Sequence, residues 1–68
     1  MEIVINGQRY SVEAGATLLS ALDALKIPHD RQGMAIALGL SVIPRSEWAT
    51  TRLKEGDRVE VVTAAQGG

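Results

Sequence analysis

The chain ends with the stretch Val61–Gly68, VVTAAQGG, in which a β-branched run gives way to small, neutral residues and a final pair of glycines. β-Branched residues favour strands, so this stretch is expected to begin in a β-strand. Glycine has no Cβ, so a Gly67-Gly68 end can thread a slot that any side chain would block. The terminal α-carboxyl group is ionised at neutral pH. The stretch therefore predicts a rigid body with a thin, flexible arm whose working group is the α-carboxyl of Gly68.

The composition of the chain excludes several classes of function. A formal net charge of -1 over 68 residues argues against nucleic acid or a membrane surface as the partner. The absence of cysteine excludes disulfides, thiolate metal sites and thiol nucleophiles. No apolar run approaches the roughly 18 residues of a membrane span, and the N-terminal segment lacks the basic region of a signal peptide. We therefore expect one small domain in the cytoplasm, a monomer when alone, with no metal site and no bound cofactor.

The strand that precedes the arm is the last of five that β-branched and alternating patterns predict. The five are expected over residues 2–6, 9–12, 34–38, 41–43 and 58–63. The first two should form a hairpin, because Asn6-Gly7 supplies two residues that tolerate φ above zero. The third and fourth are joined by Gly39-Leu40, which fits a two-residue type II′ turn with glycine first.

One helix is expected between the second and third strands, over residues 18–26. Thr17 can act as its N-cap, and Pro28 is expected to end it because proline lacks an N–H and clashes with the preceding turn. Leucines recur at the spacing i, i+4, i+7 that places them on one face of a helix. The buried face is predicted to consist of Leu18, Leu22 and Leu25.

The order of these elements is that of the β-grasp arrangement, in which the first and last strands lie side by side. Ser46 is expected to cap a single turn that places Trp48 as a lid on the core, a role we favour over an interface anchor. The expected fold class is α+β: a ubiquitin-like β-grasp with a mixed sheet of about five strands and one main helix packed on one face. This domain should cover residues 1–64, followed by a flexible Gly-Gly tail over 65–68.

The chain resembles the ThiS family of sulfur carriers, and more distantly MoaD and ubiquitin, over nearly all of its 68 residues. The resemblance is carried by Asn6-Gly7, the helix entry over 15–25, the run IPRSEWA over 43–49, Glu55-Gly56-Asp57 and the terminal Gly67-Gly68. The chain departs from the family at Gly39-Leu40, where members usually carry an Asn-Gly-type turn. The departure predicts an exposed Leu40 at a hairpin tip.

The resemblance implies a sulfur carrier for the thiazole ring of thiamin. A ThiF-like adenylating enzyme would use ATP and Mg²⁺ to form an acyl-adenylate at Gly68, and a persulfide sulfur donor would then displace AMP to leave a thiocarboxylate. A ThiG-like thiazole synthase would receive the sulfur. Ala64 and Ala65 keep the arm that ends in Gly67-Gly68 thin, and Gln66 adds no charge to oppose the nucleotide. With no catalytic constellation of its own, the chain is expected to be a protein cosubstrate and not an enzyme.

Strand parity also predicts a docking surface, because neighbouring residues of a strand point to opposite faces. With the residues on either side of it facing the helix, Val4 faces outward. The same parity turns Val62 outward, and the two-residue turn pairs Ala37 with Val42 on that face. Exposed apolar patches often mark interfaces, so Val4, Ala37, Val42 and Val62 form the predicted partner-binding patch, with scattered surface aliphatics as the alternative.

Two other functions stay open at the level of the sequence. One is a MoaD-like carrier for molybdopterin synthesis or another sulfur pathway, which would use the same terminal carboxyl group. The other is a β-grasp interaction module with an inert tail. Of the remaining polar residues, His29 is expected to be a solvated loop residue, and Arg45 and Arg52 to be exposed charges or contacts to an acidic partner.

Overall fold

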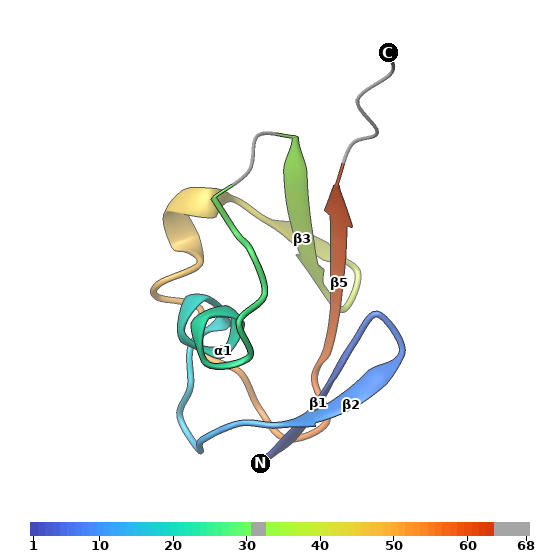
Figure 1. Ribbon diagram of the computed structural model, residues 1–68, viewed down its shortest axis with the longest axis vertical. Coiled ribbons are helices and arrows are strands. Elements are labelled where there is room, and N and C mark those ends of the chain that lie inside the picture. Colours follow the sequence, from blue (N-terminus) through green and yellow to red (C-terminus); the bar gives the residue numbers. More distant parts are fainter. Residues whose placement is uncertain (31–32, 64–68) are drawn as a thin grey trace.

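The computed structural model describes residues 1–30 and 33–63, and within them the chain forms a five-stranded sheet with one α-helix packed against one face (Figure 1). The elements are β1 (Glu2–Ile5), β2 (Gln8–Ser11), α1 (Leu18–Ala24), β3 (Met34–Leu38), β4 (Ser41–Ile43), the 3₁₀-helix η1 (Arg45–Glu47) and β5 (Arg58–Thr63). The strand order is β2-β1-β5-β3-β4, with β1 and β5 parallel and the other neighbours antiparallel. The predicted mixed β-grasp sheet is confirmed. None of the described helices is long and apolar enough to cross a membrane.

Both tight turns form where the sequence places them. Asn6 and Gly7 join β1 to β2 with φ of 49° and 84°, the pair of positive values that a type I′ turn requires. Gly39 has φ of 63° and begins the two-residue turn between β3 and β4. The register that follows pairs Ala37 with Val42, as predicted. Leu40 at this second hairpin tip is fully exposed, so that prediction is confirmed as well.

The helix begins at the predicted cap. The side-chain oxygen of Thr17 accepts a hydrogen bond from the backbone N–H of Ser20 (3.1 Å), and the Ser20 hydroxyl accepts one from the N–H of Thr17 (2.9 Å). This reciprocal pair is a capping box with serine in place of the usual acidic or amide residue. It satisfies two backbone donors that the first turn of a helix leaves without intrahelical partners.

The predicted end of the helix is wrong: α1 stops at Ala24, before Pro28 can act on it. Lys26 adopts φ of 58°, and its N–H donates to the Asp23 carbonyl (3.1 Å). The N–H of Ile27 donates to the Leu22 carbonyl (2.9 Å). These two bonds define a Schellman motif, which usually carries glycine at the position that Lys26 occupies. Because the sequence offers no glycine there, its pattern did not reveal the earlier stop.

The core is aliphatic and lies between α1 and the inner face of the sheet. Leu18 and Leu22 are buried as predicted, whereas Leu25 packs against the core only partly buried. The fully buried side chains that contribute most volume are Trp48, Ile3, Leu18, Leu22, Ile36 and Val59. Side chains from β1, β5, β3 and α1 therefore meet in one cluster.

Trp48 closes this core, and the prediction of a core lid is confirmed. Only 2% of its surface is exposed, and its indole Nε1–H donates to the carbonyl of Ile43 (2.8 Å). The predicted cap of the turn before it is wrong, because Pro44 is the N-cap of η1 and Ser46 lies inside it. The fixed φ of proline is compatible with the start of a helical turn, so a side-chain cap is not required.

Replacing Leu22 by alanine tests the core. Leu22→Ala should lower the free energy of unfolding by roughly 2–5 kcal/mol, because a fully buried leucine leaves a cavity in a small core. Leu40→Ala is the matched control, since the same truncation at a fully exposed leucine should change it by less than about 0.5 kcal/mol. Urea unfolding measures both variants. Equal effects of the two substitutions would contradict the placement of Leu22.

Candidate functional site

β5 brings the chain from the centre of the sheet toward its predicted reactive end. The strand lies between β1 and β3, and its last residue, Thr63, is paired with Met34. The site residues Gln66, Gly67 and Gly68 lie outside the described residues, as do the predicted tail and the domain boundary before it. The structure therefore describes the segment that leads to the terminal carboxyl group as far as Thr63.

The outer face of the sheet, opposite α1, exposes small apolar side chains where β5, β3 and β4 lie side by side. The pairing places Ala35 opposite Val62 and Ala37 opposite Val42. Val42 keeps 71% of its surface exposed and Val62 keeps 58%. We call these four residues the outer patch. The predicted pairing of Ala37 with Val42 and the outward position of Val62 are confirmed, whereas their part in partner binding stays a prediction.

Val4 also faces outward, but its predicted place in the same patch is wrong. β1 is paired with the beginning of β5, so Val4 lies opposite Arg58. Val62 comes four residues later on β5, a separation of about 13 Å at the rise of a strand. Parity predicts which face a residue occupies, but the register between β1 and β5 is set by long-range packing and no local pattern shows it.

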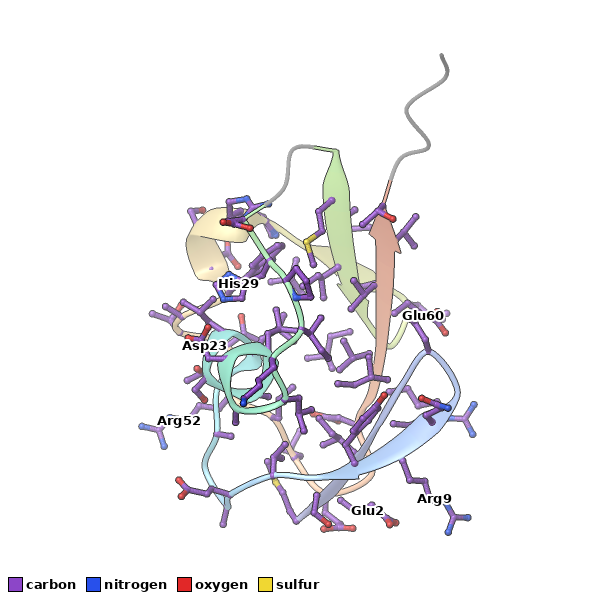
Figure 2. All side chains as sticks on the ribbon, viewed as in Figure 1. Glu2, Arg9, Asp23, His29, Arg52 and Glu60 are labelled. Carbon is purple, nitrogen blue, oxygen red and sulfur yellow. The ribbon has the colours of Figure 1, made fainter. Side chains whose placement is uncertain are left out.

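Charged and apolar groups are separated along the outer face. Glu60 is paired with Ala37 and is exposed, and along β5 it lies between Arg58 and Val62. Figure 2 shows Glu60 on the opposite side of the molecule from Asp23 and α1. Glu60 thus places a charged group beside the apolar outer patch.

Two of the three large apolar side chains that the described residues expose belong to this patch. The three are Leu40, Val42 and Val62, from the β3–β4 turn, β4 and β5. Folded domains leave isolated aliphatic residues exposed without consequence, but a group on one part of one face is typical of a contact surface. Leu40 lies in the β3–β4 turn, where the Gly39 N–H donates to the Arg58 carbonyl (2.8 Å), at the end of β5 away from Val62.

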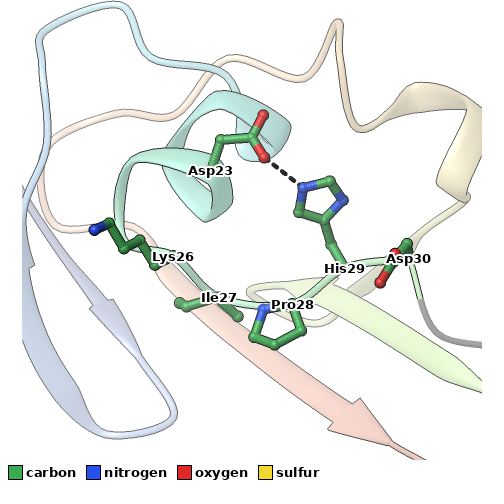
Figure 3. Close-up of a pocket in the computed structure, with 6 residues that line it drawn as sticks. All are labelled: Asp23, Lys26, Ile27, Pro28, His29 and Asp30. Atoms are coloured by element: carbon green, nitrogen blue, oxygen red, sulfur yellow. Dashed lines mark hydrogen bonds and ion pairs between the residues drawn. The ribbon is translucent and has the colours of Figure 1, made fainter.

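A pocket of about 260 Å³ lies elsewhere, at the end of α1 (Figure 3). It is lined by Asp23, Lys26, Ile27, Pro28, His29 and Asp30. His29 Nε2 lies 2.5 Å from Asp23 Oδ1, and the histidine side chain keeps only 26% of its surface exposed. His29 lies in a loop and stays partly exposed, as predicted, and the reversal after α1 also turns its ring toward Asp23. No group of three or more potential metal ligands occurs among the described residues.

The two arginines weighed as partner contacts have different environments. The Arg45 guanidinium lies over the Trp48 ring, with Cζ 4.4 Å from the ring centroid, and donates to the backbone carbonyl of His29. A cation held over an indole face is stabilised by the ring quadrupole. Arg45 thus joins η1 to the segment that follows α1. Arg52 is exposed, and its backbone forms an isolated β-bridge with Thr17.

These features define the class of the chain. A β-grasp sheet whose central last strand leads toward the C-terminal segment, with an apolar patch beside that strand, is a small ubiquitin-like protein. The family model described as ThiS family matches residues 3–68. The chain belongs to the ThiS family.

Relatives of known name and structure agree with this membership. The chain is 29% identical to the sulfur carrier protein ThiS of Escherichia coli over the whole of both proteins. It is 31% identical to a thiazole synthase of Paramagnetospirillum magneticum, and there it spans about a fifth (20%) of the longer protein. The crystal structure of the thiamine biosynthesis protein ThiS from Geobacter metallireducens superposes with a TM-score of 0.81 at 27% identity, covering all of both chains. A solution structure from the same organism gives 0.73, covering 88% of that chain.

A charge placed in the outer patch tests its role in docking. Val62→Asp should leave the fold intact, because Val62 is exposed. It should weaken binding to the adenylating enzyme that the family resemblance implies at least about ten-fold, because the carboxylate would be desolvated without a partner. Thr63→Asp is the control, since it adds the same charge one residue later on the opposite parity. Calorimetry measures binding, and circular dichroism checks the fold. Equal affinities of Val62→Asp and wild type would exclude this face as the contact.

Proposed function

We propose that the chain carries sulfur for thiamine biosynthesis as a thiocarboxylate on Gly68. The observation that carries the proposal is the family match, which runs to residue 68 and so includes the terminal glycines. The full-length similarity to a protein named as a sulfur carrier, and to structures named for thiamine biosynthesis, supports the same pathway. These matches favour thiamine over molybdopterin synthesis, and a carrier over an interaction module with an inert tail.

The chemistry begins from a carboxylate, which is a poor electrophile. In the proposed first step, a carboxylate oxygen of Gly68 attacks the α-phosphorus of ATP, and pyrophosphate leaves with Mg²⁺ neutralising its charge. The acyl-adenylate now has AMP as a leaving group. The terminal sulfur of a persulfide donor attacks the carbonyl carbon and displaces AMP, and a reducing thiol then cleaves the S–S bond. The product is a thiocarboxylate, whose terminal sulfur is a better nucleophile than the carboxylate oxygen.

In this proposal the chain is a substrate of other enzymes and catalyses nothing itself. ATP and Mg²⁺ are bound by the adenylating partner, so this chain binds no cofactor. From Thr63 to Gly68 the backbone can span up to about 17 Å, which allows the carboxyl group to enter a partner site while the domain docks outside it. The outer patch lies on the same strand that leads to the carboxyl group, so docking there would also place the start of the arm.

A thiazole synthase is the proposed acceptor of the sulfur. The protein of that name in Paramagnetospirillum magneticum contains a region similar to the whole of this chain. Joining two modules in one polypeptide raises their effective concentration, an advantage when they act on each other. A ThiF-like adenylating enzyme and a persulfide donor are proposed from the chemistry of the carboxylate. The requirement for ATP favours the cytoplasm as the setting.

Shortening the chain by one residue tests the working group. Removal of Gly68 leaves a carboxylate on Gly67 but withdraws it by about 3.3 Å, which is large compared with the geometry that acyl transfer requires. The deletion should fold normally and fail in ATP–pyrophosphate exchange with the adenylating enzyme. Wild type with ATP, the enzyme and the sulfur donor should gain the mass of one oxygen exchanged for sulfur, localised to Gly68 by fragmentation.

Two substitutions distinguish the effect of the length of the arm from the effect of side-chain size. Gly68→Ala keeps the reach and adds one methyl group, so it should retain more activity than the deletion. Gly67→Val should fail, because a β-branched side chain crowds a narrow slot and restricts the backbone. Full activity of the deletion, or sulfur found elsewhere on the chain, would overturn the carrier function and favour the interaction module.

A further inference from the structure

The side-chain amide of Asn6 hydrogen-bonds to both the N–H and the carbonyl of one residue of β5. Its Nδ2 donates to the carbonyl of Val61 (3.1 Å), and its Oδ1 accepts a hydrogen bond from the N–H of Val61 (2.8 Å). The backbone N–H of Asn6 donates to the carbonyl of Val59 (2.9 Å). Asn6 therefore makes three hydrogen bonds to a strand that lies more than fifty residues later in the chain.

These bonds continue the central pairing of the sheet beyond the end of β1. The register of β1 with β5 ends at the pair Ile5–Val59, whereas β5 runs on to Thr63. In a strand the N–H and C=O of one residue point to the same side, and those of the next residue point to the other side. The N–H and C=O of Val61 point away from β3, and the Asn6 amide supplies the donor and acceptor that a further residue of β1 would otherwise provide.

The position makes two demands that asparagine meets together. Asn6 has φ of 49°, in the left-handed region that asparagine, aspartate and glycine tolerate best. The contact with Val61 also needs one donor and one acceptor in the same plane, which a primary amide offers. Aspartate at neutral pH lacks the donor, and glycine lacks both groups. One residue thus closes the β1–β2 turn and holds the end of β5.

We propose that Asn6 is a positioning residue for activation of the terminal carboxyl group. Asn6 holds Val61 on the edge of β5 that faces β1, while β3 pairs with the opposite edge of the strand. Asn6 thereby helps to set the direction in which β5 leaves the sheet. Val61 directly precedes Val62 of the outer patch, and Thr63, the last residue of β5, follows. The bond therefore fixes the end of β5, beside the outer patch, from which the chain continues toward Gly68. This inference rests on the proposed function at Gly68.

Asn6→Gly is the test, because glycine keeps the turn conformation and removes only the amide. The adenylating enzyme treats this chain as a substrate, so partial unfolding lowers the substrate concentration and raises the apparent KM. A misdirected arm instead lowers kcat. In ATP–pyrophosphate exchange, Asn6→Gly should lower kcat by about ten-fold and change KM by less than about two-fold, a loss typical of misplacement of a reacting group.

Gly7→Ala is the matched control in the same turn. A Cβ there meets nothing within 4 Å, but φ of 84° strains any residue other than glycine. The variant should lose stability and leave the Asn6 amide in place, so its apparent KM should rise without a fall in kcat. Asn6→Asp keeps the acceptor for the Val61 N–H but opposes a carboxylate oxygen to the Val61 carbonyl, and its kcat should lie between those of wild type and Asn6→Gly.

NMR of the isolated protein gives a second readout that needs no enzyme. Asn6→Gly should lose hydrogen-exchange protection at the Val61 N–H and lower the backbone order parameters of Val62 and Thr63. Unchanged order parameters, or a raised KM with an unchanged kcat, would overturn the positioning role. If wild type itself supports no pyrophosphate exchange, the proposed function fails, and the order parameters alone then decide whether Asn6 fixes the end of β5.

Discussion

The parallel pairing of β1 with β5 is the constraint on which the rest of the structure depends. It brings the first and last strands together in the centre of the sheet, through hydrogen bonds such as Val4 N–H to the Asp57 carbonyl (2.9 Å). The β1–β2 and β3–β4 hairpins are local structures, and neither buries enough apolar surface alone to be stable. β5 joins them, and the buried pair Ile5–Val59 then forms one core with the helix. Because these contacts are far apart in sequence, closing them costs chain entropy that only the completed core offsets.

The two faces of the sheet have separate tasks. The inner face is covered by α1 and closed by Trp48, which uses most of what a 68-residue chain can bury. The outer face has no such cover within the described residues, and it exposes Val42 and Val62. A domain of this size has little room for a deep catalytic cleft beside its core. In the proposed function, the domain presents its terminal group to a larger enzyme, and the outer face of the sheet is the surface that the enzyme contacts.

The errors in the predictions have a common origin. The stop of α1 at Ala24 depends on a lysine in a left-handed conformation, which is stable only because Ile27 packs back on the core. That reversal also brings His29 onto Asp23. Val4 was assigned the right face but the wrong neighbours, because the register of β1 against β5 depends on which side chains fill the core. Apart from the local cap of η1, these errors concern contacts that the pattern of a single segment does not show.

The sequence by itself determined the five strands, the Thr17 cap, the two glycine turns and the lid formed by Trp48, because each follows from local residue chemistry or from size and hydrophobicity. The sequence also indicated the family and the predicted working group, the α-carboxyl of Gly68. Only the tertiary structure decided that Ala35 replaces Val4 beside Val62, and that the amide of Asn6 meets Val61. The reason is physical: strand register and side-chain bonds across the sheet are set by the packing of the whole core, which no short stretch of sequence contains.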